Sequence, residues 1–119
     1  MINHIKPGKR LSGATVHNGL IYTSGQTPDD LTADVQGQSR QVLAKLDALL
    51  AAAGSDKSKI LSAMVWVPDI AHRDEFNVVW DAWVAEPGPA RACVESKLAA
   101  PGILVEVALV AAVATDTIN

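Results

Sequence analysis

The chain has 119 residues, which is enough for one compact domain and too few for two. Hydrophobic residues make up 49% of it and charged residues 19%, a balance that excludes intrinsic disorder because such a chain can bury a sizeable core. The formal net charge is −3 and there is no basic block, which argues against a nucleic-acid-binding protein, since its affinity would depend on neutralising phosphates. We therefore expect a single domain over residues 1–119 without a nucleic-acid partner.

The cysteine and histidine content argues against metal and disulfide chemistry. Cys93 is the only cysteine, so no disulfide can form within the chain, and the three histidines are too scattered to predict a metal site. The first ten residues lack the apolar core of a signal peptide, and no apolar run approaches the ~20 residues that span a bilayer. These features predict a reduced, cytoplasmic protein without a membrane partner.

The first half of the chain predicts a hairpin followed by a helix. Residues 1–12 are polar and are interpreted as a lead-in to the domain. Two β-rich segments, residues 15–17 and 20–24, flank Asn18-Gly19, a pair that readily adopts the positive φ angles of a type I′ turn. Apolar side chains at helical spacing then predict a helix over residues 34–53, with Asp34 as its N-cap and Gly54 just past its end.

The second half predicts a strand, a helix and two further strands. Residues 60–67 form the strand, and an apolar stripe predicts the helix over residues 72–84. The last two strands are predicted over residues 90–98 and 103–113. The order is therefore ββαβαββ. This order predicts an α+β sandwich in which both helices lie on one face of a mixed sheet, because both crossovers can return to the same side.

The last predicted strand is apolar on both of its faces. One face carries Ile103, Val105, Val107, Leu109 and Val113, and the other carries Leu104, Ala108, Val110 and Ala112. Two helices can cover only one side of a sheet, so the other apolar side needs a different cover. In a chain this short, that cover is expected to be another subunit, and the sequence predicts an oligomer.

Glu106 interrupts this strand, and a charge there is costly unless it is paired or hydrogen-bonded. If Ala92 and Val94 of the preceding strand pack against the helices, period-two alternation places Arg91 and Cys93 on the face of Glu106. Two interpretations remain open for Arg91 and Glu106. They form either a buried salt bridge at a subunit interface or part of a functional site.

Two further residues also have a structural and a functional interpretation. Cys93 has no neighbouring base in the sequence, so it is expected to be a small hydrophobic residue rather than a nucleophile. Gly25 ends a strand, where it could simply form a turn or could let backbone N–H groups approach a ligand.

Four segments together resemble the YjgF/RidA family. The segment PARACVE at residues 89–95 and the segment LVEV at residues 104–107 match the C-terminal signature of the family. NGLIYTSGQ at residues 18–26 matches an N-terminal block, and Asn77 in FNVVW lies where the family has a helix asparagine. The resemblance covers nearly the whole chain in the same order.

The resemblance implies a fold, an assembly and an activity. The fold is the chorismate-mutase-like ββαβαββ sandwich, and three subunits form a central barrel with ligand clefts between neighbours. The activity is hydrolysis of reactive enamines and 2-imino acids, such as those released by pyridoxal-phosphate enzymes, to 2-oxo acids and ammonia. No metal or cofactor is implied. The catalytic pair would be Arg91, binding the substrate carboxylate, and Glu106, activating water. Gly25, Asn77 and Cys93 would complete the substrate-binding cleft.

One departure from the family pattern keeps alternatives open. RidA proper carries a tyrosine in an N-terminal cleft segment, and this chain has Leu11 there, next to Arg10. A non-catalytic trimer that binds small carboxylates, or that acts as a regulatory or chaperone-like partner, is the alternative. Ribonuclease or translation-inhibitor activity, a label often attached to the family, is disfavoured by the acidic charge balance.

Overall fold

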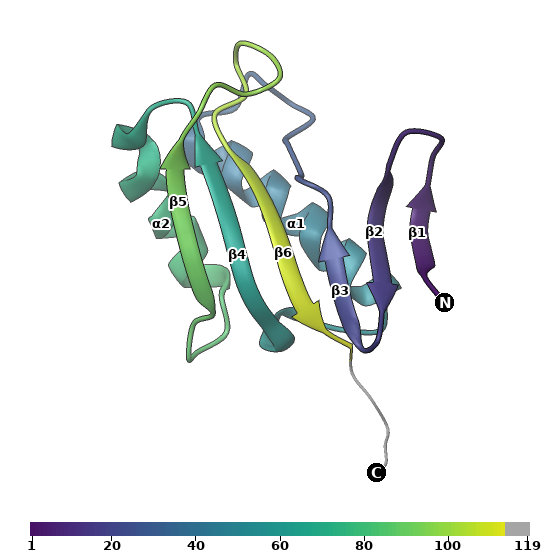
Figure 1. Cartoon of the computed structure of the whole chain (residues 1–119). Helices are drawn as coiled ribbons and strands as arrows, with labels where there is room; N and C mark the ends of the chain where they lie inside the picture. Colours follow the sequence, from purple (N-terminus) through teal and green to yellow (C-terminus); the bar gives the residue numbers. More distant parts are fainter. Residues whose placement is uncertain (114–119) are drawn as a thin grey trace.

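The computed structural model describes residues 1–113. A six-stranded mixed sheet, in the order β1-β2-β3-β6-β4-β5, packs against two helices that lie on the same face (Figure 1). The strands are β1 (Asn3–Pro7), β2 (Ser12–His17), β3 (Leu20–Thr23), β4 (Ile60–Val67), β5 (Ala90–Glu95) and β6 (Glu106–Ala112). The helices are α1 (Val35–Ala52) and α2 (Arg73–Trp83), and two 3₁₀ turns, Lys57–Lys59 and Ile70–His72, precede β4 and α2.

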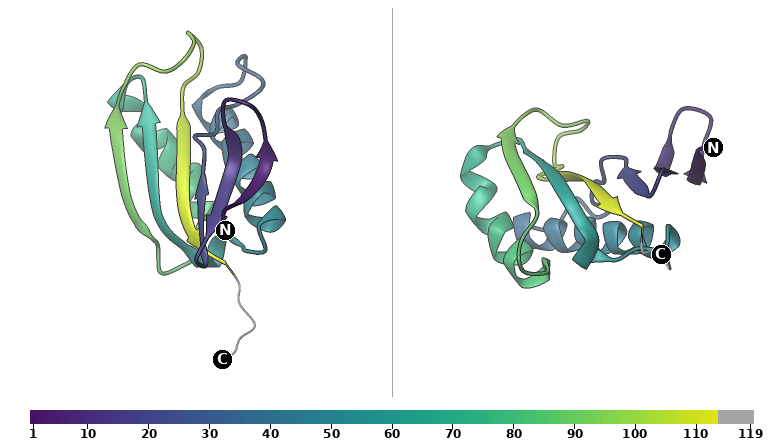
Figure 2. Two further views of the ribbon diagram at one scale, coloured as in Figure 1. Left: turned by 45° about the vertical axis from the view of Figure 1, so that its right-hand side comes forward. Right: turned by 60° about the horizontal axis from the view of Figure 1, so that its bottom comes forward.

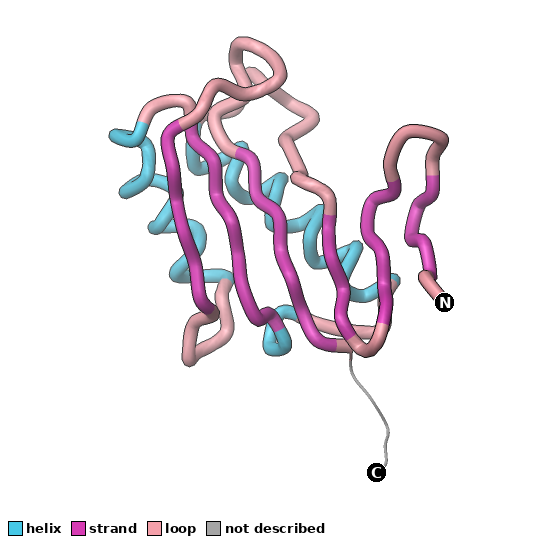
Figure 3. Tube along the Cα trace, in the orientation of Figure 1, coloured by secondary structure: helices cyan, strands magenta, loops and turns pink. Residues whose placement is uncertain are grey.

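The arrangement confirms the expected two-layer α+β architecture. Strand β4 pairs in parallel with β5 and antiparallel with β6, so the sheet is mixed. The two views of Figure 2 show both helices on the same side of the sheet, and nothing in the described chain covers its other side. The tube in Figure 3 shows the same separation of a strand layer and a helix layer.

The N-terminal segment differs from the sequence-based expectation. Residues 1–12 were expected to be a lead-in, but Asn3–Pro7 forms the edge strand β1, which pairs antiparallel with β2. Of the residues in β1, only Ile5 is partly buried. An edge strand held by backbone pairing alone needs no apolar alternation, so hydrophobic periodicity does not detect it. The following hairpin agrees with expectation, because Asn18 and Gly19 both have positive φ angles, 51° and 78°.

Helix α1 begins and ends where its sequence signals indicate. The Asp34 side chain accepts a hydrogen bond from the Gly37 N–H at 2.8 Å, which caps the helix, and Gly54 follows the helix with φ of 79°. Its buried side chains include two polar ones, Gln38 and Ser39. Helix α2 is one residue shorter at each end than expected and buries Phe76, Val79 and Trp80.

The last two strands are shorter than the sequence predicts. Strand β5 ends at Glu95 rather than at residue 98, and β6 begins at Glu106 rather than at residue 103. Leu104 donates its backbone N–H to the Gln38 side chain instead of to a neighbouring strand, so the ladder starts two residues later. Glu106 is therefore the first residue of β6 and lies at the end of the sheet.

The two faces of β6 differ in burial. Val107, Leu109 and Ala111 point into the core between the sheet and the helices and are buried, whereas Ala108 and Val110 are partly exposed on the open face. A shallow depression of about 510 Å³ runs over that open face. Nothing in residues 1–113 covers this open apolar face, as the sequence predicts. Neither helix of the described chain is long and apolar enough to cross a membrane.

Candidate functional site

Arg91 lies on the helix side of β5. It is in register with Ala63 of β4, which is buried beneath the helices. The guanidinium carbon Cζ lies 5.6 Å from the ring centroid of Phe76 and 5.3 Å from that of Trp80, both on α2. Its nitrogen Nη1 is buried and has no hydrogen-bond partner among the described residues. Two aromatic rings therefore hold a cation that has a free donor for an anion.

Cys93 and Asn77 lie in the same region, where β5 meets α2. Cys93 follows Arg91 by two residues and is in register with the buried Val65. Burial raises the pKa of its thiol, and the positive charges of Arg91 and Arg73 only partly offset this effect. Asn77 follows Phe76 on α2, and its Oδ1 is buried without a partner in the described chain. We call Arg91, Asn77 and Cys93 the β5 half-site.

Glu106 and Gly25 form a second group at the start of β6. A Cβ atom on Gly25 would overlap the Glu106 carboxylate and would lie 2.9 Å from its Cδ, so the carboxylate lies directly against the glycine backbone. The backbones of Gln26 and Val107 exchange two hydrogen bonds, of 2.9 and 3.2 Å, which fixes this contact. We call Glu106 and Gly25 the β6 half-site.

The expectation that Arg91 and Cys93 share a sheet face with Glu106 is wrong. Glu106 is in register with the partly exposed Trp66 and belongs to the open face, whereas Arg91 and Cys93 point toward α2. The expected packing is inverted, because Ala92 and Val94 are exposed whereas Arg91 and Cys93 are partly buried.

Arg91 and Glu106 form no salt bridge within the chain. The ion pairs within residues 1–113 are Lys45–Asp29 and Arg73–Asp74. Arg91 and Glu106 are three residues apart along β4 and two strands apart across the sheet, a Cα separation of about 14 Å. The interpretation of a buried Arg91–Glu106 salt bridge therefore does not apply within one subunit.

The aromatic platform under Arg91 was not identified as part of a site from the sequence. Phe76 and Trp80 are four residues apart on α2, and the apolar stripe of this helix predicts a core position for both, which is where they lie. Their second role depends on β5 presenting Arg91 to the same face. The only sequence signal is the i, i+4 aromatic pair, which is far more common in cores than beneath a cation.

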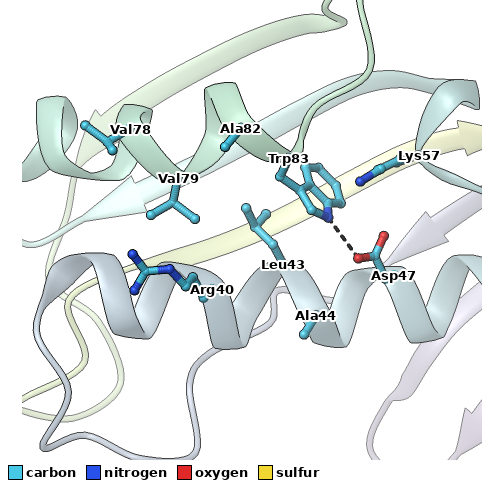
Figure 4. A pocket seen from close by; sticks show the side chains of 9 residues that line it. All are labelled: Arg40, Leu43, Ala44, Asp47, Lys57, Val78, Val79, Ala82 and Trp83. Carbon is cyan, nitrogen blue, oxygen red and sulfur yellow. Dashed lines mark hydrogen bonds between the residues drawn. The ribbon is translucent and has the colours of Figure 1, made fainter.

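A separate groove of about 420 Å³ runs between the two helices on the outer side of the molecule (Figure 4). Trp83 forms one wall and donates its indole N–H to Asp47 at 2.9 Å, and the Lys57 ammonium lies 5.5 Å from its ring centroid. None of the site residues expected from the sequence lines this groove. Within residues 1–113 no three His, Cys, Asp or Glu side chains group as metal ligands.

Leu11 and Arg10 lie in the turn between β1 and β2. Both side chains are exposed, and Leu11 exposes 63% of its surface. The turn borders a surface depression lined also by His4 and Lys9.

Comparison with known proteins identifies the family. Residues 1–113 match the family model described as endoribonuclease L-PSP. A RutC family protein of Haemophilus ducreyi is 40% identical over 114 residues, which cover 95% of this chain and 97% of that protein. The RutC family protein YoaB of Escherichia coli is 40% identical over 105 residues, or 87% of this chain and 91% of that protein.

The solved structures agree with the sequence matches. A crystal structure of a YjgF family member from Neisseria meningitidis superposes with a TM-score of 0.94 at 40% identity and covers 97% of each chain. A crystal structure of yeast Mmf1, at 22% identity and a TM-score of 0.89, shares the fold. Because the family model covers nearly the whole chain and these relatives match over most of their length, the chain belongs to the YjgF/RidA family.

Proposed function

We propose that this protein hydrolyses reactive 2-imino acids, and the enamines in equilibrium with them, to 2-oxo acids and ammonia. The observation that carries the proposal is Arg91, a guanidinium that lies over two neighbouring aromatic rings, with a buried nitrogen that has no partner in the described chain. A guanidinium binds a carboxylate through two parallel hydrogen bonds, so a small carboxylate is the ligand that its free donors favour. Asn77 Oδ1, buried on α2 without a partner in the described chain, would accept a hydrogen bond from the substrate nitrogen.

Glu106 supplies the proton acceptor that hydrolysis needs. Water adds its oxygen to the carbon of the protonated imine while Glu106 takes a proton from that water, and the electron pair of the C=N bond moves onto nitrogen. Return of the proton to nitrogen then lets ammonia leave as the hydroxyl oxygen forms the C=O bond and gives its proton to Glu106, and ammonia takes up this proton as it departs. The imine carbon is already electrophilic, so the protein has only to orient the reactants and transfer protons.

The proposal includes assembly into a homotrimer. The two half-sites lie on opposite faces of the sheet, about 14 Å apart at their Cα atoms, so one chain cannot close both on a small molecule. A cleft between subunits would bring the β5 half-site of one subunit against the β6 half-site of its neighbour. The open apolar face over β4 and β6 favours such packing. Light scattering at micromolar concentration should give three times the chain mass, and a monomer or dimer would contradict this assembly.

A coupled assay tests the activity. A pyridoxal-phosphate dehydratase generates 2-imino acids from its amino-acid substrate, and 2-oxo acid formation is followed with and without the protein. We expect acceleration over spontaneous hydrolysis that is lost in Glu106→Gln, which keeps the shape of the side chain but cannot accept the proton. No acceleration with any of several side chains would remove the proposal.

A second candidate function is binding of small carboxylates without turnover. It is favoured by Leu11, an exposed aliphatic residue where the resemblance to RidA places a tyrosine. Calorimetry with a 2-oxo acid separates the two functions. Binding that is abolished by Arg91→Ala, together with no turnover in the coupled assay, would establish the binding protein.

A further inference from the structure

Gln38 is a fully buried polar side chain in the middle of the interface between α1 and the loops at one end of the sheet. Its Nε2 donates to the carbonyl oxygens of Gly102 at 2.8 Å and Ala33 at 3.1 Å, with Leu31 O at a longer 3.4 Å. Its Oε1 accepts from the Leu104 N–H at 2.8 Å. A single amide therefore satisfies backbone groups of two different loops.

These two loops lead to the β6 half-site. The first follows Gly25 and connects β3 to α1, and the second connects β5 to β6 and ends at Glu106. Both lie at the same end of the sheet (Figure 1). Leu104, bonded to Gln38, is two residues from Glu106, and Val107, bonded to Gln26, is the next residue after it. Glu106 is thus fixed from one side by Gln38 and from the other by the segment that carries Gly25.

We propose that Gln38 is a positioning residue for Glu106, a role that rests on the function proposed above. Without its amide, Leu104 N–H and the carbonyl of Gly102 would be left buried and unpaired, and the loop would shift to find other partners. That shift would move the Glu106 carboxylate relative to Gly25. A displacement of about 1 Å is enough to reduce a reaction that depends on orientation. Arg91 lies within β5, four residues before that strand ends and in register with Ala63 of β4, so its position depends on sheet pairing rather than on the Gln38 hydrogen bonds, and carboxylate binding should be retained.

Helix α1 offers a matched control one turn away. Gln41 also clamps a loop with its amide, accepting from the N–H groups of Asp29 and Asp30 at 3.0 and 2.9 Å and donating to Asp30 O at 3.2 Å. Among the described residues, its side-chain hydrogen bonds go to the β3–α1 loop and none goes to the β5–β6 loop. Gln38→Met and Gln41→Met remove an amide of the same size from the same helix. A difference in kcat between the two variants therefore reports the effect of the hydrogen bonds to the β5–β6 loop.

The experiment measures kcat and KM in the coupled assay, and the backbone amide signals of Gly25 and Glu106 by NMR. For Gln38→Met we expect kcat to fall at least tenfold with KM changed less than threefold, and both amide signals to shift. For Gln41→Met we expect kcat and KM within twofold of the unmodified protein and no shift of the Glu106 signal. Equal losses in the two variants, or a KM that rises as much as kcat falls, would overturn the positioning role.

The experiment still tests the role of Gln38 if a variant does not fold or if the unmodified protein is inactive. If Gln38→Met does not fold, Gln38→Glu, which keeps the size of the side chain and the acceptor for Leu104 N–H, is measured by the same criteria. If neither folds, Gln38 serves folding only and the proposal fails. If the unmodified protein is inactive, the proposed function fails by itself, and the NMR signals then decide whether Gln38 places Glu106. Unchanged signals in Gln38→Met would overturn that placement.

Discussion

Replacing Gly25 with alanine is expected to displace the Glu106 carboxylate while leaving the fold intact. The added Cβ would overlap the carboxylate and would lie 2.9 Å from Cδ and 3.1 Å from Cγ of Glu106. Gly25 does not have a positive φ angle, so alanine can adopt its backbone conformation without strain. The side chain of Glu106 is only partly buried and can rotate away from the new methyl group.

The expected change in stability is small because two opposing effects nearly cancel. Forcing Glu106 off its preferred rotamer costs about 0.5–1.5 kcal/mol. Alanine also restricts the unfolded chain relative to glycine, which stabilises the fold by about 0.4–1 kcal/mol. The free energy of unfolding should therefore stay within about 1 kcal/mol of the unmodified protein. By contrast, kcat should fall by about 10²–10⁴-fold, the contribution of a positioned general base.

Chemical unfolding and the coupled deaminase assay measure the two quantities separately. Gly88→Ala is the control, because a Cβ there meets no atom within 4 Å and Gly88 has no positive φ. A double-mutant cycle supplies the decisive comparison, since Gly25→Ala should have no further effect on kcat in a Glu106→Ala background. The steric argument is refuted if Gly25→Ala keeps kcat within threefold, or if it lowers kcat equally without Glu106.

Two further predictions concern the β5 half-site. Arg91→Lys keeps a positive charge near Phe76 and Trp80 but loses the bidentate geometry of the guanidinium. The Kd for a 2-oxo acid should therefore rise about 10–100-fold with little change in melting temperature. A rise in Kd of less than threefold, measured by calorimetry, would contradict this prediction. Burial raises the pKa of the Cys93 thiol, so at a given pH a smaller fraction of it is thiolate than in a free cysteine. Alkylation by iodoacetamide should therefore be slower than that of free cysteine at pH 8 and should level off at a higher pH, and a faster reaction at pH 8 would show that the thiol is activated.

The elements that the sequence predicted well are those with strong local signals. Asn18 and Gly19 adopt the positive φ angles of the expected turn, and Asp34 caps α1 through the expected side-chain hydrogen bond. These features depend on a few neighbouring residues, so composition and spacing suffice. Strand β1 was missed because its stability comes from backbone pairing with β2, to which its polar side chains contribute no pattern.

The faces of β5 could not be assigned from hydrophobicity alone. Ala92 and Val94 are more apolar than Arg91, and simple alternation therefore placed them toward the helices. Strand β5 is the edge of the sheet, and its inner face meets the rings of Phe76 and Trp80, which accept a guanidinium. Tertiary contacts between distant segments decided the orientation. Ala92 instead adds to the depression on the open apolar face.

The inverted orientation of β5 decides whether Arg91 and Glu106 can act on the same ligand within one subunit. If Arg91 and Glu106 shared a face, a single subunit could hold both around one ligand, and assembly would be needed only to cover apolar surface. Because they point to opposite sides of the sheet with β4 between them, a small imino acid cannot reach both within one chain. Any reaction that uses the two residues together must therefore take place between subunits. The same open face that leaves each chain with uncovered apolar surface then also provides the contact that would complete the site.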